Sequence, residues 1–431
     1  CQAGWYRKSV EVAASARSCF DCPAGTDCPY GSTTLPTLHL RRGSWRIAGQ
    51  ARQVEVCRTT PTGATSCQGG SDAGNDGEGY CAPGHRGPQC EVCIDEGHYF
   101  EWRSASCTRC PPATHYVMIY SLLLCIPTTL LCAASVIHHR SPRARQAIRR
   151  IFAVLKSLRY ESKVKLIIGF VQVVAVIGKV YSIAMPGLFR AVLQSLEALY
   201  LDVLSDMFAP SECLGGYANL LLLEVGLPLA LMAVGALAVF IVYVLRRLRQ
   251  EPGAMKQPRK LFKDAGKTSA MIVLRAALWL LVFFYASVSS SIFGAFHCLR
   301  FVEDSDQRLY REFLAKSLDI ECPSDGHAGS DAYFQLRSIA LILVFMWPLG
   351  CFGGLAILLV RIRKAVLRRR PTELSHATCM LTRDYKPAYY WWDLADMFRK
   401  LVLNSLVVLV PERIAFLRLI VALLVSVLCL A

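Results

Sequence analysis

Runs of about 20 apolar residues recur from residue 116 onward, and they limit the possible folds more than any other feature. A helix needs roughly 20 such residues to cross the hydrocarbon core of a bilayer. Five strong runs and two weaker ones are present, at Tyr116–Ile137, Val164–Met185, Tyr217–Leu245, Ala270–Phe296, Ser338–Val360, Trp391–Val410 and Ile414–Ala431. We therefore expect residues 116–431 to form a mainly α-helical, polytopic membrane bundle of about seven spans.

The connections between these runs alternate in charge. Residues 138–163, 246–268 and 361–390 each carry eight Lys or Arg and at most two acids. Residues 186–216 carry one basic residue and four acids, and residues 297–332 carry four basic residues and eight acids. The positive-inside rule places the basic connections in the cytoplasm. We expect a multi-pass protein with its N-terminus extracellular or lumenal, in a plasma or ciliary membrane rather than an organelle.

The net charge of +16 does not indicate nucleic-acid binding, because residues 1–110 carry eleven basic and eleven acidic residues. The excess lies in the inner loops, where the expected partners are membrane lipids. In the first loop, apolar residues at helical spacing predict a basic amphipathic helix that binds anionic lipid. The plain alternative is charge that only fixes topology. The residues concerned are Arg149, Arg150, Lys156 and Arg159.

Residues 1–110 contain eleven of the nineteen cysteines in a Gly- and Pro-rich setting. Three Cys-x-x-Cys pairs occur, at Cys19/Cys22, Cys90/Cys93 and Cys107/Cys110. In the cytosol this spacing favours zinc, whereas outside the cell it favours disulfides that stabilise a small core. Because the loop charges place the segment outside, we predict an extracellular cysteine-rich domain and no metal.

Two submodules resemble known repeats. Residues 1–28, with Cys1-Gln-Ala-Gly-Trp-Tyr and Cys19-Phe-Asp-Cys22, resemble the short cysteine-rich repeats of ephrin-receptor and tumour-necrosis-factor-receptor ectodomains. Residues 81–110, with Gly84-x-x-Gly-Pro-x-Cys90-x-x-Cys93, resemble a laminin-type EGF repeat.

The whole arrangement resembles algal and protist membrane proteins that join such repeats to a region related to the fungal transient-receptor-potential (TRP-like) family. Two stretches support it, beginning Lys163-Val-Lys-Leu-Ile-Ile-Gly-Phe-Val-Gln172 and Tyr389-Tyr-Trp-Trp-Asp393. The resemblance implies a TRP-like ion channel or a channel-like sensory protein, with ions as ligands and a homo- or hetero-oligomeric assembly. However, only Pro411-Glu-Arg413 joins the last two runs, which is too short for a re-entrant pore loop.

The repeat resemblances also guide a disulfide pairing. The local set that they favour is Cys1–Cys19, Cys22–Cys28, Cys57–Cys67, Cys81–Cys90 and Cys93–Cys107. Cys110 then remains, together with three outer-loop cysteines, Cys213, Cys298 and Cys322. This even total favours Cys298–Cys322 and a Cys110–Cys213 bond that ties the ectodomain to the bundle. A free thiol or an intermolecular bridge is the alternative.

Ionisable side chains inside spans are costly and mark candidate functional positions. Lys179 and Glu224 fall at similar depth on antiparallel spans, where they predict either a structural ion pair or a polar pathway. Arg275 lies near the inner end of its span, where snorkelling to the headgroups is expected.

The densest polar cluster beside an apolar run contains Asp393, Asp396, Arg399 and Lys400. Spacings of three and four residues place Asp396 on one helical face with Arg399 and Lys400. We expect either a gating helix at the membrane interface or a helix that only anchors the chain at the membrane surface.

No Walker loop, dinucleotide fingerprint or His-Glu-x-x-His motif is present, so we expect neither an enzyme nor a cofactor. A non-conducting seven-helix receptor and a lipid or small-solute transporter are the alternatives to a channel. The chain begins at Cys1 without a signal peptide and ends within an apolar run, so we also expect a processed or partial chain.

Overall fold

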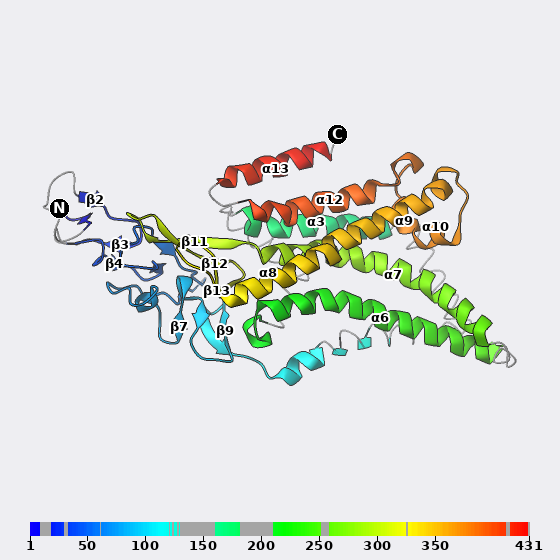
Figure 1. Cartoon of the computed structure of the whole chain (residues 1–431), viewed down its shortest axis with the longest axis horizontal. Coiled ribbons are helices and arrows are strands. Elements are labelled where there is room, and N and C mark those ends of the chain that lie inside the picture. Colours follow the sequence, from blue (N-terminus) through cyan, green and yellow to red (C-terminus); the bar gives the residue numbers. More distant parts are fainter. Residues whose placement is uncertain are drawn as a thin grey trace. The chain divides into compact units, whose positions relative to one another are not determined.

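The computed structural model describes 1–8, 19–29, 33–60, 62–119, scattered residues of 121–129, 160–181, 210–250, 258–324, 326–410 and 414–429. The chain divides into two compact units, which are described separately (Figure 1). Unit 1 contains Cys1–Pro112, Ala209–Leu220 and Ala295–Ile339. Unit 2 contains the remainder, which is Ala113–Phe208, Leu221–Gly294 and Ala340–Ala431. The cysteine-rich N-terminal unit therefore includes two later segments that lie beyond the expected domain 1–110.

Short antiparallel hairpins make up the cysteine-rich part of unit 1, as expected for a segment rich in glycine and disulfides. The paired strands are β1 (Trp5–Arg7) with β2 (Cys19–Asp21), β3 (Thr26–Asp27) with β4 (His39–Leu40), β5 (Ser44–Trp45) with β6 (Glu55–Val56), β7 (His85–Arg86) with β8 (Val92–Cys93), and β9 (His98–Glu101) with β10 (Ser106–Arg109). Single 3₁₀ turns lie at Glu78–Tyr80, Pro88–Cys90 and Glu212–Leu214.

The core of unit 1 forms around Trp45 and Arg46, which are both fully buried. The Arg46 guanidinium donates to the Tyr80 hydroxyl at 2.8 Å and to the Leu35 carbonyl at 2.8 Å. The Trp45 indole donates to the Gly77 carbonyl at 3.0 Å. Gly77 has φ of 78°, and a Cβ there would lie 2.4 Å from the Arg46 carbonyl oxygen, so the turn requires glycine. Buried polar groups in this core are therefore satisfied by backbone carbonyls.

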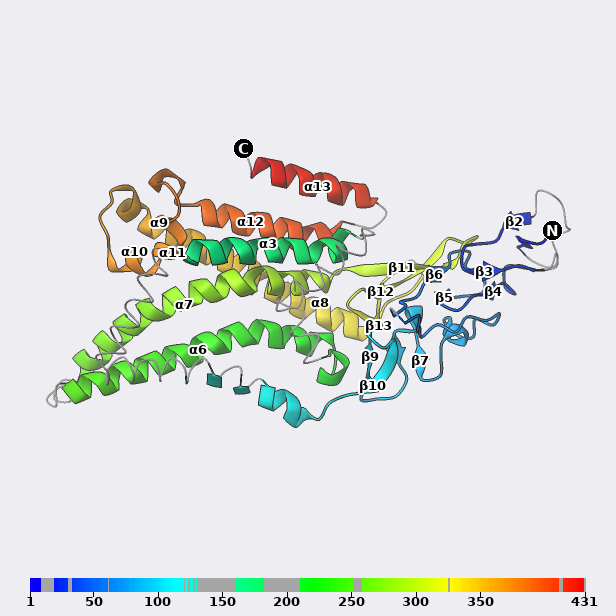
Figure 2. The ribbon, with the colours of Figure 1, turned by 180° about the vertical axis from the view of Figure 1, so that it is seen from behind.

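Residues 298–322, which the sequence predicts only as an acidic outer loop, form a three-stranded antiparallel sheet. Its strands are β11 (Cys298–Asp304), β12 (Leu309–Leu314) and β13 (Ser317–Cys322), with β12 in the centre. The three strands lie beside the cysteine-rich hairpins (Figure 2). Phe301 and Phe313 join the buried core of these hairpins, and the Phe301 ring meets Trp45 edge-on at 5.5 Å. The sheet thus completes the core of unit 1.

Ion pairs at the margin of this sheet hold the N-terminal segment. The Lys8 ammonium lies 2.6 Å from the Asp306 carboxylate, and the Arg52 guanidinium lies 3.6 Å from the same carboxylate. The hydrogen bond from Lys8 lowers the pKa of Asp306 below its ordinary value. A lowered folded-state pKa stabilises the fold above the unfolded pKa, and this contribution is lost as the pH falls through the folded pKa. The contact therefore weakens under acidic conditions.

Seven disulfides close unit 1, and their connectivity is the one expected from the sequence. Five are local, at Cys1–Cys19, Cys22–Cys28, Cys57–Cys67, Cys81–Cys90 and Cys93–Cys107. Cys298–Cys322 links the two edge strands of the sheet. Cys110–Cys213 links residues 103 positions apart, with Cα atoms 5.6 Å apart. Both expected long-range pairings are therefore confirmed.

The Cys110–Cys213 bond gives a first prediction. Replacing Cys110 with Ser leaves the Cys213 thiol unpaired, so one additional site should react with a membrane-impermeant maleimide on intact cells. Peptide mass spectrometry should place the label on Cys213. The matched control is Cys125→Ser, which removes a cysteine that belongs to none of the seven disulfides and should leave Cys213 unlabelled. Labelling of Cys213 in the unmodified protein would contradict the bond.

Unit 2 is helical. Its helices are α3 (Tyr160–Tyr181), α6 (Tyr217–Gln250), α7 (Pro258–Gly294), α8 (Asp331–Val344), α9 (Gly350–Leu367), α10 (Glu373–Ala377), α11 (Cys379–Thr382), α12 (Trp392–Asn404) and α13 (Ala415–Leu428), where α6 and α8 begin within unit 1. Short 3₁₀ turns lie at Pro387–Tyr389 and Leu406–Leu409. Within the described residues, three helices are long and apolar enough to cross a membrane, at Tyr217–Gln250, Arg259–Gly294 and Asp331–Leu367. These match three of the predicted runs and indicate a membrane protein.

The third of these helices contains Pro348 in its interior. Proline removes a backbone donor and crowds the preceding turn. The helix accommodates Pro348 within a π-helical turn at Phe345–Leu349, so that α8 and α9 form one continuous helical segment.

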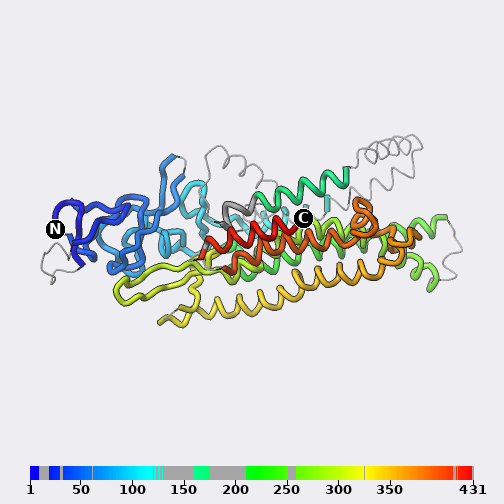
Figure 3. Tube along the Cα trace, turned by 90° about the horizontal axis from the view of Figure 1, so that it is seen from above, coloured from blue at the N-terminus to red at the C-terminus, as the bar shows by residue number. Residues whose placement is uncertain are grey.

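The last two predicted spans differ from expectation. The run Trp391–Val410 is not one span: α12 ends at Asn404 after 13 residues, and a 3₁₀ turn follows. α13 has 14 residues and packs along α12 through the apolar cluster of Val171, Val402 and Val407 (Figure 3). The physical reason is that the charged residues of this run are part of α12 itself. The helix therefore has too few apolar residues to cross a bilayer.

Of the two earliest runs, Tyr116–Ile137 lies mostly outside the described residues. The run Val164–Met185 coincides with α3 as far as Tyr181.

Candidate functional site

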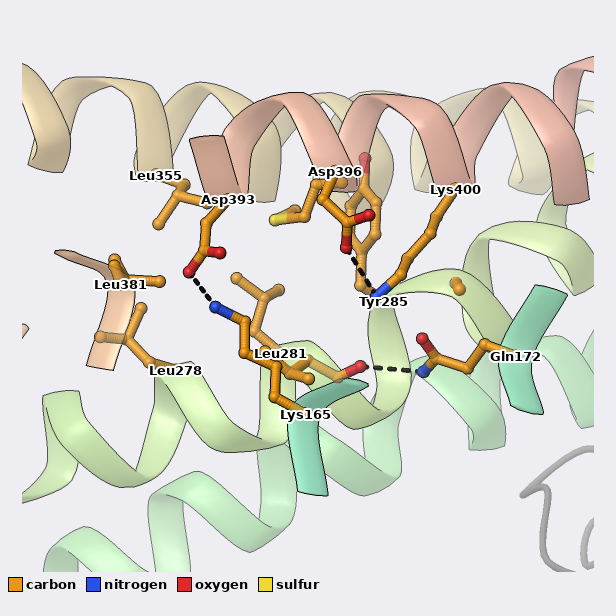
Figure 4. A pocket seen from close by; sticks show the side chains of 13 residues that line it. Lys165, Gln172, Leu278, Leu281, Tyr285, Leu355, Leu381, Asp393, Asp396 and Lys400 are labelled. Atoms are coloured by element: carbon orange, nitrogen blue, oxygen red, sulfur yellow. Dashed lines mark hydrogen bonds and ion pairs between the residues drawn. The ribbon is translucent and has the colours of Figure 1, made fainter. Parts of the chain in front are cut away.

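A set of buried polar side chains lies between α3, α7 and α12. We call it the polar seam and define it as Lys165, Gln172, Asp393, Asp396, Lys400 and Asn404 (Figure 4 labels all of them except Asn404). α12 supplies most of it because its polar residues recur at helical spacing and face inward, whereas Phe398 on another face is exposed. This orientation reverses that of a helix at the surface of a soluble protein.

An ion pair between α3 and α12 lies near the first residues of both helices. The Lys165 ammonium donates to one carboxylate oxygen of Asp393 (Figure 4). The Tyr385 hydroxyl donates to the other at 2.8 Å. Asp393 is only 4% exposed. The Lys165 ammonium also lies 5.6 Å from the centre of the Tyr385 ring, a cation–π contact. Both charges are therefore desolvated and matched.

A second charge group follows one turn further along α12. Asp396 accepts from Arg399 at 2.6 Å and lies 3.0 Å from the Lys400 ammonium. Lys400 is buried against Gly169 of α3, where a Cβ would lie 3.0 Å from its ammonium nitrogen. Glycine at position 169 therefore gives the Lys400 side chain the space that it occupies.

Two amides extend the polar seam beyond the charges. The Gln172 side-chain amide donates to the backbone carbonyls of Val282 at 2.9 Å and Phe283 at 3.0 Å on α7. The Asn404 amide donates to the Gln172 backbone carbonyl at 3.2 Å, and the Ser290 hydroxyl donates to the Asn404 carbonyl at 3.2 Å. These bonds join all three helices through groups that a bilayer core could not hydrate.

At the other end, Glu161 of α3 accepts two guanidinium groups. Arg275 of α7 lies 3.3 Å away and Arg383 lies 2.9 Å away. The Ser162 hydroxyl donates to Asp384 at 2.6 Å. The segment between α11 and α12 is thereby tied to the start of α3.

The space inside the polar seam is small. A cavity of about 20 Å³ is lined by seam residues and by apolar side chains of α7 and α9, including Tyr285 and Leu355. This volume suits about one water molecule. Among the described residues, no group of three or more His, Cys, Asp or Glu side chains is placed to hold a metal ion. The cavity can therefore hold a water molecule, but it has no room for a hydrated ion.

The structure brings together the predicted cluster of Asp393, Asp396, Arg399 and Lys400 and adds partners that the sequence analysis missed. Lys165 and Gln172 are seven residues apart and therefore share one helical face of an apolar run. That spacing was the signal that could have found them. Arg275 is about half exposed and paired with Glu161, so its predicted role in snorkelling stays a prediction.

The remaining predicted residues are not placed in the seam. The side chain of Lys179 lies outside the described residues, so its pairing with Glu224, which lies half-buried on α6, stays a prediction. Arg149, Arg150, Lys156 and Arg159 also lie outside the described residues.

Comparison with protein-family models, curated proteins and solved structures finds no match for this chain. The polar seam is therefore interpreted from its own geometry.

Removing one charge of the buried pair gives a second prediction. Asp393→Asn leaves the Lys165 ammonium buried without a counter-charge, so the free energy of unfolding should fall by about 3 kcal/mol. Lys165→Met in the same chain should restore much of that loss. Unfolding can be followed in detergent by circular dichroism at increasing denaturant.

The matched control is the exposed pair Lys267–Glu373, whose ions are 2.9 Å apart with side chains 65% and 69% exposed. Glu373→Gln should change stability by no more than about 0.5 kcal/mol, because solvent screens exposed pairs. Equal losses for Asp393→Asn and Glu373→Gln would exclude a special role for the buried pair.

Proposed function

We propose that this protein is a multi-pass, channel-like sensory membrane protein of the TRP-like type. Its cysteine-rich unit, on the extracellular side, senses a stimulus or directs assembly, and its helical unit passes ions along the polar seam. The observation that carries the proposal is the seam itself. Charged side chains within an apolar bundle are costly, and proteins that retain them usually use them in ion or proton pathways.

The directions of the helices support this arrangement. Lys165 contacts Asp393 near the starts of α3 and α12, and Gln172 contacts Asn404 further along both helices. Glu161 contacts Arg275, and Gln172 contacts Val282 and Phe283, so α7 runs in the same direction. The alternating loop charges predict that all three helices run from the inner to the outer side. Helices that return between them, α6 and α8–α9, complete the multi-pass topology.

The described state corresponds to a closed pathway. All four charges of the polar seam are paired. The cavity has a volume of about 20 Å³, which is too small for a hydrated cation. Opening would require α12 to move relative to α3 and α7, which separates Lys400 from Gly169. The 3₁₀ turn after Asn404 is a natural hinge for that motion because it interrupts the helical hydrogen bonds.

The test is reconstitution of the purified protein in planar bilayers with single-channel recording. We expect discrete currents that are cation-selective in the wild type. Asp396→Asn should shift the reversal potential toward anion permeability because Lys400 and Arg399 then lose their counter-charge. Glu373→Gln, an exposed substitution on α10, should leave the reversal potential unchanged. Absence of current from folded protein under voltage, stretch and pH steps would exclude conduction.

A non-conducting receptor is the second candidate, and one observation favours it. The complete pairing of the seam charges is also what a rigid core needs, since unpaired charges would destabilise the bundle. In that case Asp393→Asn lowers stability while no variant carries current. The two functions therefore give different results in the same recordings.

The proposed orientation gives a topological prediction. A tag inserted after residue 74 should be accessible from outside intact cells, and a tag after residue 255 should become accessible only after permeabilisation. The charge difference between the connections 246–268 and 297–332 is the physical reason. Access to both tags from one side would overturn the orientation.

A further inference from the structure

A second and larger cavity lies between α7 and α10, away from the polar seam. Its volume is about 960 Å³, which is within the range that a ligand the size of a lipid headgroup and part of its chains requires. α7 supplies one wall from Lys267 to Trp279, and the segment Pro371–Ala377 supplies the other. None of the residues that line this cavity also lines the cavity of the polar seam.

The rim of this cavity is basic. Lys267 and Arg275 project from α7, and the only carboxylate among the lining residues is that of Glu373. Thr268 and Thr372 add hydroxyl donors. A group that accepts hydrogen bonds and carries negative charge, such as a phosphate diester with a carboxylate, is complementary to this rim.

Both rim cations can turn to a ligand at low cost. The Lys267–Glu373 pair is exposed on both sides, so solvent screens it strongly. Arg275 is also about half exposed, and its partner Glu161 keeps Arg383 at 2.9 Å when Arg275 moves away. Neither movement leaves a buried charge unpaired.

The other residues of the α7 wall are mostly apolar. Met271, Ile272, Ala276 and Trp279 follow one another on α7, and Ile272 is half exposed. Lys267 and Trp279 are 12 residues apart, which is about 18 Å along the helix. A basic rim that continues into an apolar wall on a membrane helix matches an amphiphile with an anionic head and a hydrocarbon tail.

We propose that this cavity binds one anionic phospholipid, with its headgroup between Lys267 and Arg275 and its chains against Ile272, Ala276 and Trp279. The inner leaflet supplies such lipids, and the basic connection 246–268 is predicted on that side. The site is distinct from the basic segment around Arg149 that the sequence analysis assigns to lipid binding. It does not depend on whether the protein conducts ions.

The test is native mass spectrometry of the purified full chain in mixed micelles. Phosphatidylserine should remain bound in preference to phosphatidylcholine, and inorganic phosphate at millimolar concentration should not displace it. The Lys267→Ala/Arg275→Ala double variant should weaken phosphatidylserine binding about tenfold or more, because it removes both rim cations. Equal retention of the two lipids would overturn the proposal.

Three further variants separate this site from general effects of charge or folding. Arg361→Ala/Arg363→Ala removes the same charge from exposed positions on α9 and should leave binding unchanged. Ala276→Trp fills the apolar wall and should abolish binding without a change of charge. Glu373→Gln should strengthen binding several-fold, a gain that misfolding cannot produce. Equal weakening by the two double variants, or wild-type binding by Ala276→Trp, would exclude the site, as would displacement of the lipid by free phosphate.

Discussion

The buried ion pair between Lys165 and Asp393 is the interaction on which the helical unit depends. Each charge alone would cost several kcal/mol to bury, and the pair is tolerated because the Tyr385 hydroxyl completes the hydrogen bonding of Asp393. This requirement fixes the rotation of α12 about its axis, since Asp393 must face α3. Asp396, Lys400 and Asn404 then face the same seam by helical spacing alone.

Some of this structure could be predicted from the sequence because it depends on the length of apolar runs or on the number of cysteines. The long apolar runs in α6, α7 and α8–α9 exceed the bilayer thickness, so their helical character follows from length. The Cys110–Cys213 bond was favoured by parity together with the repeat resemblances: eleven cysteines before the first run leave one over, and the local pairs that the resemblances imply leave Cys110. Such arguments need no tertiary contact.

The rest depends on packing between segments that are distant in sequence. The sheet β11–β13 was missed because the many acids in residues 297–332 indicated a loop, and the alternation of apolar and polar residues around Phe301 was given less weight. The aromatic partner of Phe301, Trp45, is more than 250 residues earlier in the sequence. The run Trp391–Val410 was misread as a span for a related reason. Asp396 is paired within α12 by Arg399 and Lys400, but Asp393 becomes acceptable inside the bundle only through Lys165 of α3 and Tyr385. The spacing of Lys165 and Gln172 marks one face of α3 but does not identify Asp393 as the partner.

The covalent path of the chain limits which part of the protein can move. Two segments of unit 1, Ala209–Leu220 and Ala295–Ile339, follow the cysteine-rich hairpins in the sequence. α6 begins in the first segment and α8 in the second, and β11 begins four residues after α7 ends. Both segments are held by disulfides, the first through Cys213 and the second through Cys298–Cys322. The ends of α6, α7 and α8 next to unit 1 are therefore held by one cross-linked body. The other ends rely on exposed or half-exposed pairs such as Lys267–Glu373 and Arg275–Glu161, which are individually weak. The charge pairs where α7 meets α10 are therefore weak, and the lipid proposed there would replace them without breaking a buried ion pair of the polar seam.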